Sequence, residues 1–213
     1  MNAMQLPPTA SISDALDRLG LPGSVHGIGA LGPGQQVSGP VFTARYEPVD
    51  ESGGTVGDFL DDVPQGAVIV IDNGGHTGCT VWGGIMTQLA KMRGVAATVI
   101  NGVCRDTAVA RDIDYPIWSM GRFMRTGKDR VRLAAVNVDL IIDDVVIRPG
   151  DLLVGDDDGV VVVPADRSDE VLRLARSIED VEDAIVAAVR AGSTLKDARA
   201  AHGYHSLQTR AGR

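Results

Sequence analysis

Residues 82–107 read WGGIMTQLAKMRGVAATVINGVCRDT and contain the clearest structural pattern in the chain. A glycine pair opens it, and Ile85, Leu89 and Met92 then recur at helical spacing before another glycine that can end a helix. The apolar run over residues 96–102 has the pattern of a buried strand. The stretch therefore predicts a helix followed by a strand of a mostly parallel sheet.

The flanking segments extend this pattern on both sides. Residues 66–75, GAVIVIDNGG, form a continuous apolar run bounded by glycines, which predicts a strand buried on both faces. Residues 105–114 predict a short helix, and residues 115–121, YPIWSMG, predict a third strand. Residues 66–121 are thus a β-α-β-α-β run, and the chain belongs to the α/β class.

The N-terminal part is predicted to be a helix and then a strand. Residues 9–23, TASISDALDRLGLPG, predict a short helix that Ser11 or Ser13 caps and Gly20 ends. Residues 36–48 alternate as in a strand.

The C-terminal part changes character. Residues 135–164 contain short β segments separated by Asp-Asp, Pro-Gly and Asp-Gly turns, which predict hairpins in a mixed sheet. Residues 165–203 predict one long amphipathic helix. Its apolar stripe consists of Val171, Leu174, Ile178, Val181 and Ile185. We expect a single domain over residues 1–213, with a core at about 9–165 and a C-terminal helix and tail at 166–213.

Composition excludes several functional classes. The 213 residues carry a net charge of −8, which argues against a nucleic-acid surface. No apolar run is long enough to predict a membrane span, and the N-terminus does not resemble a signal peptide. Cys79 and Cys104 have no metal-ligand spacing and predict no disulfide framework. We therefore expect a cytoplasmic protein without nucleic-acid or membrane partners.

The central run also carries candidate chemistry. The backbone N–H groups at a helix start favour anions, and Gly83 and Gly84 allow a small carboxylate to approach the chain. Arg105 and Asp106 follow the next strand, and ligands gather at the carboxyl ends of parallel strands. An arginine can stabilise an oxyanion and an aspartate can hold a divalent cation. Together they suit a reaction of a 2-oxoacid through an enolate.

Simpler interpretations of the same residues stay open. Asp106 or Thr107 could cap the following helix, Arg105 could be a surface residue, and the glycine pair could be an ordinary turn. His76 could be a proton shuttle, a metal ligand or a loop histidine. The GDDDGV run at 155–160 lacks the pattern of a calcium loop, so a hairpin turn is the better interpretation.

Several motifs together resemble one known family. They are SDALDRLG, GPVFTAR, GAVIVIDNGG, WGGIMTQLAKMRGVAATVINGVCRD, YPIWSMG and IRPGDLLVGDDDGVVVVP. The chain resembles the RraA-like family, which includes the class II 4-hydroxy-4-methyl-2-oxoglutarate/4-carboxy-4-hydroxy-2-oxoadipate aldolases and the regulator of ribonuclease E activity A. Many members are mislabelled as demethylmenaquinone methyltransferases. The resemblance implies an α/β/β sandwich that assembles as a homotrimer or a dimer of trimers, with active sites at subunit interfaces.

The resemblance also implies roles for individual residues. Arg105 would contact the substrate, and Asp106 would anchor Mg²⁺ or Mn²⁺, mostly through waters. The backbone amides of Gly84, Ile85 and Met86 would bind the carboxylate of pyruvate.

One departure from the family pattern concerns the metal. The aldolases carry an acidic residue twenty-one positions before the arginine, and that position is Gly84 here. The candidates to compensate are Asp72, His76 and a glutamate from a neighbouring subunit's C-terminal helix. Glu182 matches that glutamate best, and Glu179 is an alternative.

The sequence thus predicts a divalent-metal-dependent carbon–carbon lyase. It would cleave a 4-hydroxy-2-oxo-dicarboxylate to pyruvate and a second oxoacid, or decarboxylate oxaloacetate, through a pyruvate enolate. One alternative is a non-catalytic regulatory interaction protein. Another keeps the metal site but uses a divergent substrate, because Gly84 replaces the acidic residue.

Overall fold

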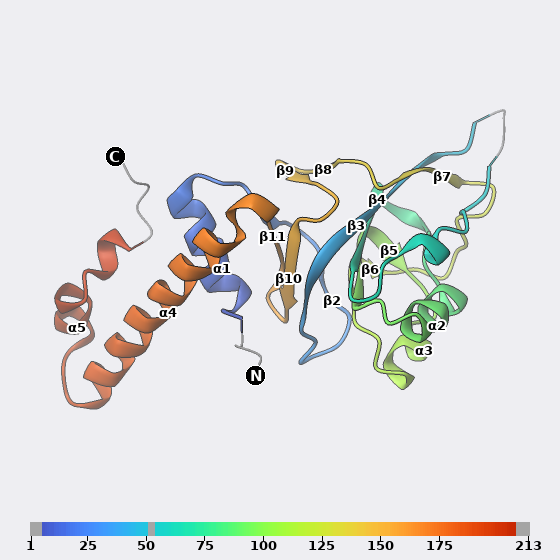
Figure 1. Cartoon of the computed structure of the whole chain (residues 1–213). Coiled ribbons are helices and arrows are strands. Elements are labelled where there is room, and N and C mark those ends of the chain that lie inside the picture. The colour runs from blue at the N-terminus through green and yellow to red at the C-terminus, as the bar shows by residue number, and fades with distance from the viewer. Residues whose placement is uncertain (1–5, 51–53, 208–213) are drawn as a thin grey trace. The chain divides into compact units, whose positions relative to one another are not determined.

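The structure is a computed structural model, and it describes residues 6–50 and 54–207 (Figure 1). The chain divides into two compact units. One unit is Ser24–Ala165, and the other combines Met1–Gly23 with Asp166–Arg213.

The Ser24–Ala165 unit is built on a mixed sheet. Among the described residues the sheet has nine strands in the order β1-β11-β10-β3-β4-β5-β6-β2, with β7 paired to β3. Strands β3 to β6 are mutually parallel and the other pairs are antiparallel. The strands are β1 Ser24–Val25, β2 Gly29–Ala30, β3 Val37–Pro48, β4 Val68–Thr80, β5 Ala97–Cys104, β6 Ile117–Arg122, β7 Val131–Val136, β10 Leu152–Asp156 and β11 Gly159–Val163.

The predicted β-α-β-α-β run is confirmed. Helix α2 (Gly84–Met92) joins β4 to β5, and helix α3 (Thr107–Asp112) joins β5 to β6. The two helices pack against each other on the same side of the sheet (Figure 1). A 3₁₀ turn, η1 (Leu60–Asp62), also contacts α2.

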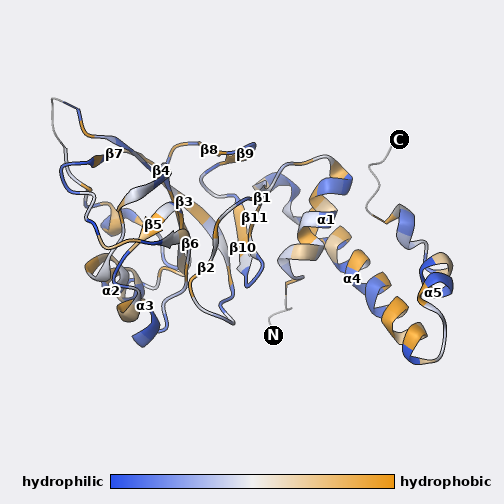
Figure 2. Cartoon of the chain, turned by 180° about the vertical axis from the view of Figure 1, so that it is seen from behind, coloured by the Kyte–Doolittle hydropathy of each residue, from blue (hydrophilic) through white to orange (hydrophobic). Residues whose placement is uncertain are grey.

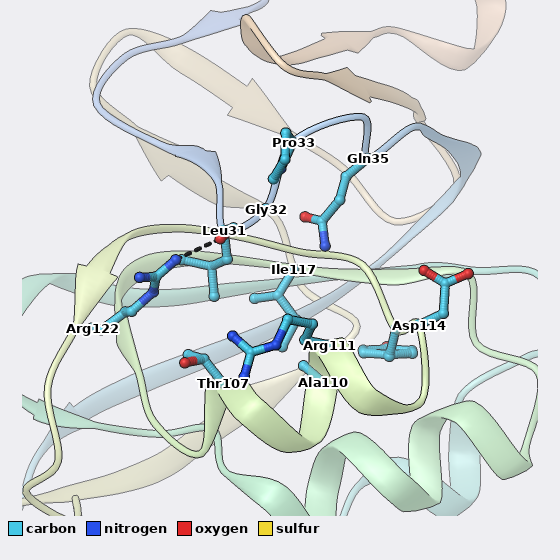
Figure 3. A pocket seen from close by; sticks show the side chains of 11 residues that line it. Leu31, Gly32, Pro33, Gln35, Thr107, Ala110, Arg111, Asp114, Ile117 and Arg122 are labelled. Carbon is cyan, nitrogen blue, oxygen red and sulfur yellow. Dashed lines mark hydrogen bonds between the residues drawn. The ribbon is translucent and has the colours of Figure 1, made fainter.

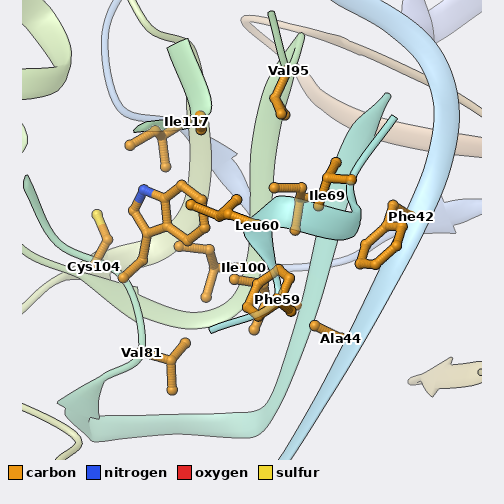
Figure 4. Close-up of a cluster of buried hydrophobic side chains, with 14 of the residues drawn as sticks. Phe42, Ala44, Phe59, Leu60, Ile69, Val81, Val95, Ile100, Cys104 and Ile117 are labelled. Atoms are coloured by element: carbon orange, nitrogen blue, oxygen red, sulfur yellow. The ribbon is translucent and has the colours of Figure 1, made fainter. Parts of the chain in front are cut away.

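The buried side chains form two clusters, because the central strands are covered on both faces. Val68 and Val70 of β4 belong to one cluster, whereas Ile69 and Ile71 belong to the other. The Ile69 cluster lies with α2 and α3 and is shown in Figure 4. The Val68 cluster includes the apolar residues of a separate hairpin, β8 (Leu140–Ile142) and β9 (Val145–Ile147). This layering confirms an α/β fold with a mixed sheet.

The predicted apolar face of α2 is wrong for Ile85 and Met92 and holds for Leu89, which packs against the core. Ile85 and Met92 are 83% and 82% exposed, whereas Gly84, Thr87 and Ala90 are buried. Helix α2 has only nine residues. Over so few turns, the spacing of the apolar residues does not determine which face of the helix is buried. The smaller side chains let the helix approach the sheet closely, Met86 and Leu89 pack partly buried against the core, and Ile85 and Met92 remain outside.

Strand β4 is longer than predicted and irregular at its end. Its register with β5 is regular up to the pair Asp72 and Asn101, then shifts twice before Thr80. Gly74 and Gly75 have φ values of 61° and 68°, so they supply the left-handed conformations that this bulged segment needs.

The second unit consists of helices. They are α1 Thr9–Leu19, α4 Ser168–Arg190 and α5 Leu195–Ala201, with 3₁₀ turns η2 Ala165–Arg167 and η3 Tyr204–Ser206. Helix α1 packs against α4, and Figure 2 shows polar and apolar residues alternating along α4. Among the described residues, no helix is long and apolar enough to cross a membrane.

Two predictions for this unit are corrected. Helix α1 begins at Thr9 after Pro8, without a side-chain cap, so neither Ser11 nor Ser13 caps it, although Gly20 ends it as predicted with φ 68°. The long C-terminal helix is two helices, because the chain turns at Gly192, whose φ is 103°. The alternation of polar and apolar residues continues across that turn. The amphipathic pattern therefore did not reveal the break between α4 and α5.

Candidate active site

The end of β5 is tied to the segment that precedes α2. The N–H group of Arg105 donates to the carbonyl oxygen of Trp82 at 3.1 Å. Trp82 is itself buried, and its indole N–H donates to the Thr87 hydroxyl at 2.9 Å. The core thus holds Arg105 and Asp106 beside the start of α2.

The Asp106 carboxylate connects the two segments directly. Its Oδ2 atom accepts a hydrogen bond from the backbone N–H of Gly84 at 2.8 Å, and Arg105 Nε lies 3.6 Å from the same oxygen. The Arg105 and Asp106 side chains are 39% and 47% exposed, so both are within reach of a ligand. A carboxylate at the N-terminal end of a helix is stabilised by the helix dipole.

This geometry decides between interpretations of Asp106. The residue stands at the N-cap position of α3 with φ 55°, but its side chain makes no capping hydrogen bond there. Aspartate tolerates this left-handed conformation better than most residues. The carboxylate instead caps α2, so the Gly84 amide is engaged. The Ile85 and Met86 amides, which have no partner within the helix, are those that remain for a substrate carboxylate.

The two glycines have different roles. A Cβ atom at Gly83 would lie 3.0 Å from Asp106 Oδ2 and 3.1 Å from Arg105 Nε, which is closer than side chains normally pack. A Cβ atom at Gly84 would meet its nearest atoms at 3.4 Å, an ordinary contact. Glycine at position 83 is therefore what allows Arg105 and Asp106 to approach α2.

A depression of about 220 Å³ opens beside this pair. Its lining residues are Cys104, Arg105, Asp106, Thr107, Arg122, Phe123 and Met124. Burial raises the pKa of the Cys104 thiol, which disfavours the thiolate form. Arg122 was not among the residues expected from the sequence. It ends β6, the last of the parallel strands, and lies opposite Cys104 in register.

The other candidate metal ligands of the Ser24–Ala165 unit lie on β4. Asp72 Oδ1 accepts from the Gly74 N–H and from Asn101 Nδ2, both at 2.8 Å, and His76 lies opposite Gly102 in the bulged part of β4. No group of three or more His, Cys, Asp or Glu side chains suited to a metal occurs in residues 6–50 and 54–207.

A single exposed carboxylate nevertheless fits one kind of metal site. Mg²⁺ commonly keeps several waters and takes one or two carboxylate oxygens from the protein. Asp106 offers this, because Gly84 and Arg105 contact Oδ2 and leave Oδ1 available.

The proposed catalytic glutamates lie in the helical unit. Glu182 is on α4, and burial, followed by the charges of Asp14, Asp183 and Glu179, raises the pKa of its carboxyl. The roles proposed for Glu182 and Glu179 depend on a neighbouring subunit and stay predictions.

Known proteins with similar sequences support one family. The family model described as RraA-like, Aldolase/RraA, matches residues 9–162. Protein DlpA of Legionella pneumophila is 40% identical over 194 residues, which are 90% of this chain but 32% of DlpA. This chain thus spans about a third of that relative. A putative 4-hydroxy-4-methyl-2-oxoglutarate aldolase of Halalkalibacterium halodurans is 34% identical over 177 residues, covering 83% of this chain and 82% of the relative.

Solved structures agree with this fold. An uncharacterized protein from Pseudomonas syringae pv. tomato is 47% identical with a TM-score of 0.87, covering 92% of this chain and 90% of that one. RraAS2 of Streptomyces coelicolor is described as an unusual member of the RNase ES inhibitor RraA protein family. It is 31% identical with a TM-score of 0.74, covering 82% of this chain and 88% of that one.

Proposed function

The chain belongs to the RraA-like family, and from that membership we propose that it is a divalent-metal-dependent carbon–carbon lyase acting on 2-oxoacids. The proposed reactions are cleavage of a 4-hydroxy-2-oxo-dicarboxylate to pyruvate and a second oxoacid, and decarboxylation of oxaloacetate. Both pass through the enolate of pyruvate. The name of the Halalkalibacterium relative supports the aldolase reaction. The observation that carries the proposal is the Arg105–Asp106 pair held against the start of α2.

The binding roles follow from the arrangement of charges and amides. The Ile85 and Met86 N–H groups at the start of α2 bind the carboxylate of the 2-oxoacid. The guanidinium of Arg105 stabilises the negative charge that develops on the enolate oxygen.

Two further roles concern the metal and the proton. Asp106 would hold a Mg²⁺ or Mn²⁺ ion, which when bound polarises the 2-oxo group. Glu182 of a second subunit in a homotrimer or hexamer is the proposed group for proton transfer. Its raised pKa suits a proton acceptor, because the efficiency of a base increases as its pKa approaches the working pH.

The test is release of pyruvate from oxaloacetate and from 4-hydroxy-4-methyl-2-oxoglutarate, with Mg²⁺ or Mn²⁺ and with EDTA. Arg105→Ala is expected to lower kcat by about 10²–10³, as for loss of an oxyanion donor. Arg148→Ala is the matched control, because Arg148 Nε also lies 3.6 Å from an aspartate, Asp139. Turnover that resists EDTA, or an Arg105→Ala protein as active as the wild type, would refute the proposed mechanism.

Two alternatives rest on specific observations. The likeness to RraAS2 favours a non-catalytic regulator that binds a protein partner, and it predicts no metal-dependent turnover. Gly84, in place of the acidic residue that the resemblance implies, favours the same metal site with a divergent substrate. Pyruvate release from either test substrate would count against both.

A further inference from the structure

A second cavity lies between residues 31–35 and helix α3 (Figure 3). It measures about 170 Å³, and its walls include the apolar side chains of Leu31, Pro33, Ala110 and Ile117. A cavity of about 150 Å³ is large enough to hold a benzene molecule. The second cavity therefore has room for a ligand with a short hydrocarbon chain.

The charged side chains around this cavity lie on opposite sides of it. Figure 3 shows the guanidinium groups of Arg111 and Arg122 on the side where Thr107 lies, with Asp114 on the other side. Arg111 is 76% exposed and its contact with Asp112 is 4.0 Å long, so it is weakly engaged. Within residues 6–50 and 54–207, the Asp114 carboxylate forms no ion pair. The arginines and Asp114 thus do not neutralise each other.

Gln35 adds a polar group to the same cavity. Figure 3 shows its side chain extending from the 31–35 segment towards Ile117. Its Oε1 atom is buried and accepts no hydrogen bond from the part of the chain that the structure describes. A buried acceptor without a donor destabilises a protein, so a ligand that brings an N–H group to this atom gains affinity.

We infer that this cavity binds a small ω-amino acid, whose ammonium and carboxylate groups are separated by methylene groups. The carboxylate meets Arg111 and Arg122, because an arginine can bind a carboxylate through two parallel hydrogen bonds. The ammonium group meets Asp114 and Gln35, and the methylene groups contact the apolar wall. A simple anion would leave Asp114 unpaired, and a simple cation would leave the arginines unpaired. An α-amino acid carries both charges on one carbon atom, so it would not span the cavity.

This ligand site is distinct from the candidate active site and does not depend on the proposed reaction. Gln35, Arg111 and Asp114 line the second cavity but not the depression beside Arg105 and Asp106. Binding can therefore be measured without turnover.

The probe is 4-aminobutanoate, with three matched comparators. In pentanoate a methyl group replaces the ammonium group, in 4-aminobutanamide an amide replaces the carboxylate, and in 2-aminobutanoate both charges are on one carbon atom. Titrations of the full chain, followed by backbone amide NMR, should show that 4-aminobutanoate binds about tenfold more tightly than each comparator. This is the lower end of the range for a charge-assisted hydrogen bond, because the charged groups are exposed. The shifted signals should belong to residues 31–35 and 107–115.

Variants assign the two ends of the ligand. Asp114→Asn should remove the preference over pentanoate, and asparagine tolerates the φ of 52° at this position. Arg111→Gln should lower the preference over 4-aminobutanamide several-fold, since Arg122 remains. Asp143→Asn is the matched control, because Asp143 has φ 53° and lines neither cavity, and it should keep both preferences. The amide spectrum of each variant shows whether it is folded.

The inference fails if the wild-type chain binds the four compounds equally well or binds none of them. It also fails if the preference over pentanoate survives in Asp114→Asn. Arg105→Ala separates this site from the candidate active site and should keep both preferences. Loss of both preferences in Arg105→Ala, or shifts centred on residues 83–86, would place the ligand in the active site and overturn the inference.

Discussion

A methyl group added at Gly83 should disturb the site more than one added at Gly84. The new Cβ atom at position 83 would lie 3.0 Å from Asp106 Oδ2 and 3.1 Å from Arg105 Nε. The backbone at Gly83 has φ −149° and ψ −169°, an extended conformation that alanine adopts without strain. The effect of Gly83→Ala is therefore a local displacement of these two side chains.

The size of the effect follows from the hydrogen bond that must give way. Asp106 Oδ2 would have to move by a few tenths of an ångström, which stretches its 2.8 Å bond to the Gly84 N–H. Hydrogen bonds to charged groups contribute about 1.5–3 kcal/mol, and the lower value applies to a half-exposed carboxylate. At 2–4 °C per kcal/mol, the melting temperature should fall by roughly 3–6 °C.

The effect on catalysis should be larger. Misplacement of catalytic groups by about 1 Å can cost 10²-fold in rate, so a smaller shift should lower kcat/KM by roughly tenfold or more. Gly84→Ala is the control, because its Cβ atom meets only ordinary contacts at 3.4 Å and alanine favours the helix. Differential scanning fluorimetry and pyruvate release measure the two effects. A Gly84→Ala protein as impaired as Gly83→Ala would refute the reasoning.

Three further substitutions test other parts of the structure. Thr87→Val leaves the buried Trp82 indole N–H without its acceptor at 2.9 Å, so thermal unfolding should show a loss of about 1–3 kcal/mol. Glu182→Gln should raise the melting temperature near pH 7 and have no effect below about pH 4. Burial, followed by the charge of Asp14, raises the pKa of Glu182, so the folded state binds more protons and wild-type stability falls as pH rises through that window. Asp106→Asn should abolish Mn²⁺ binding in calorimetry yet shift the melting temperature by no more than about 4 °C. Asparagine tolerates φ 55° and can accept the Gly84 hydrogen bond, and a half-exposed ion pair contributes about 0–1 kcal/mol.

The parallel core was predictable from sequence because its strands carry an unambiguous signal. The run from Val68 to Ile71 is apolar at every position, and such a run between glycines fits a strand covered on both faces. The orientation of α2 was not predictable, because Ile85 and Met92 fit an inward face as well as the smaller residues do. The close packing of Gly84 against Asp106 settles the choice, and it involves residues 22 positions apart.

Only those residues of the candidate site that belong to one continuous sequence motif could be predicted. Arg105 and Asp106 were found because they follow a strand of the parallel run and match a family motif. Arg122, which lines the same depression, was not predicted, because its position near Arg105 depends on the register of β5 and β6. Spacing along the chain does not encode that register. The use of Asp106 to cap α2 was also hidden, since a residue before a helix is expected to cap that helix.

Gly84 links the metal question to the substrate question. An acidic side chain at that position would start from a Cβ atom 3.4 Å from Asp106, and the two carboxylates could hold an ion together. Here Asp106 acts alone, and one of its oxygens is already engaged by Gly84 and lies near Arg105. An ion that Asp106 held by one remaining oxygen would be bound more firmly when substrate is present. Metal and substrate would then raise each other's affinity by the same factor. A substrate that binds tightly would then hold the proposed ion more firmly, which would compensate for the carboxylate that position 84 lacks.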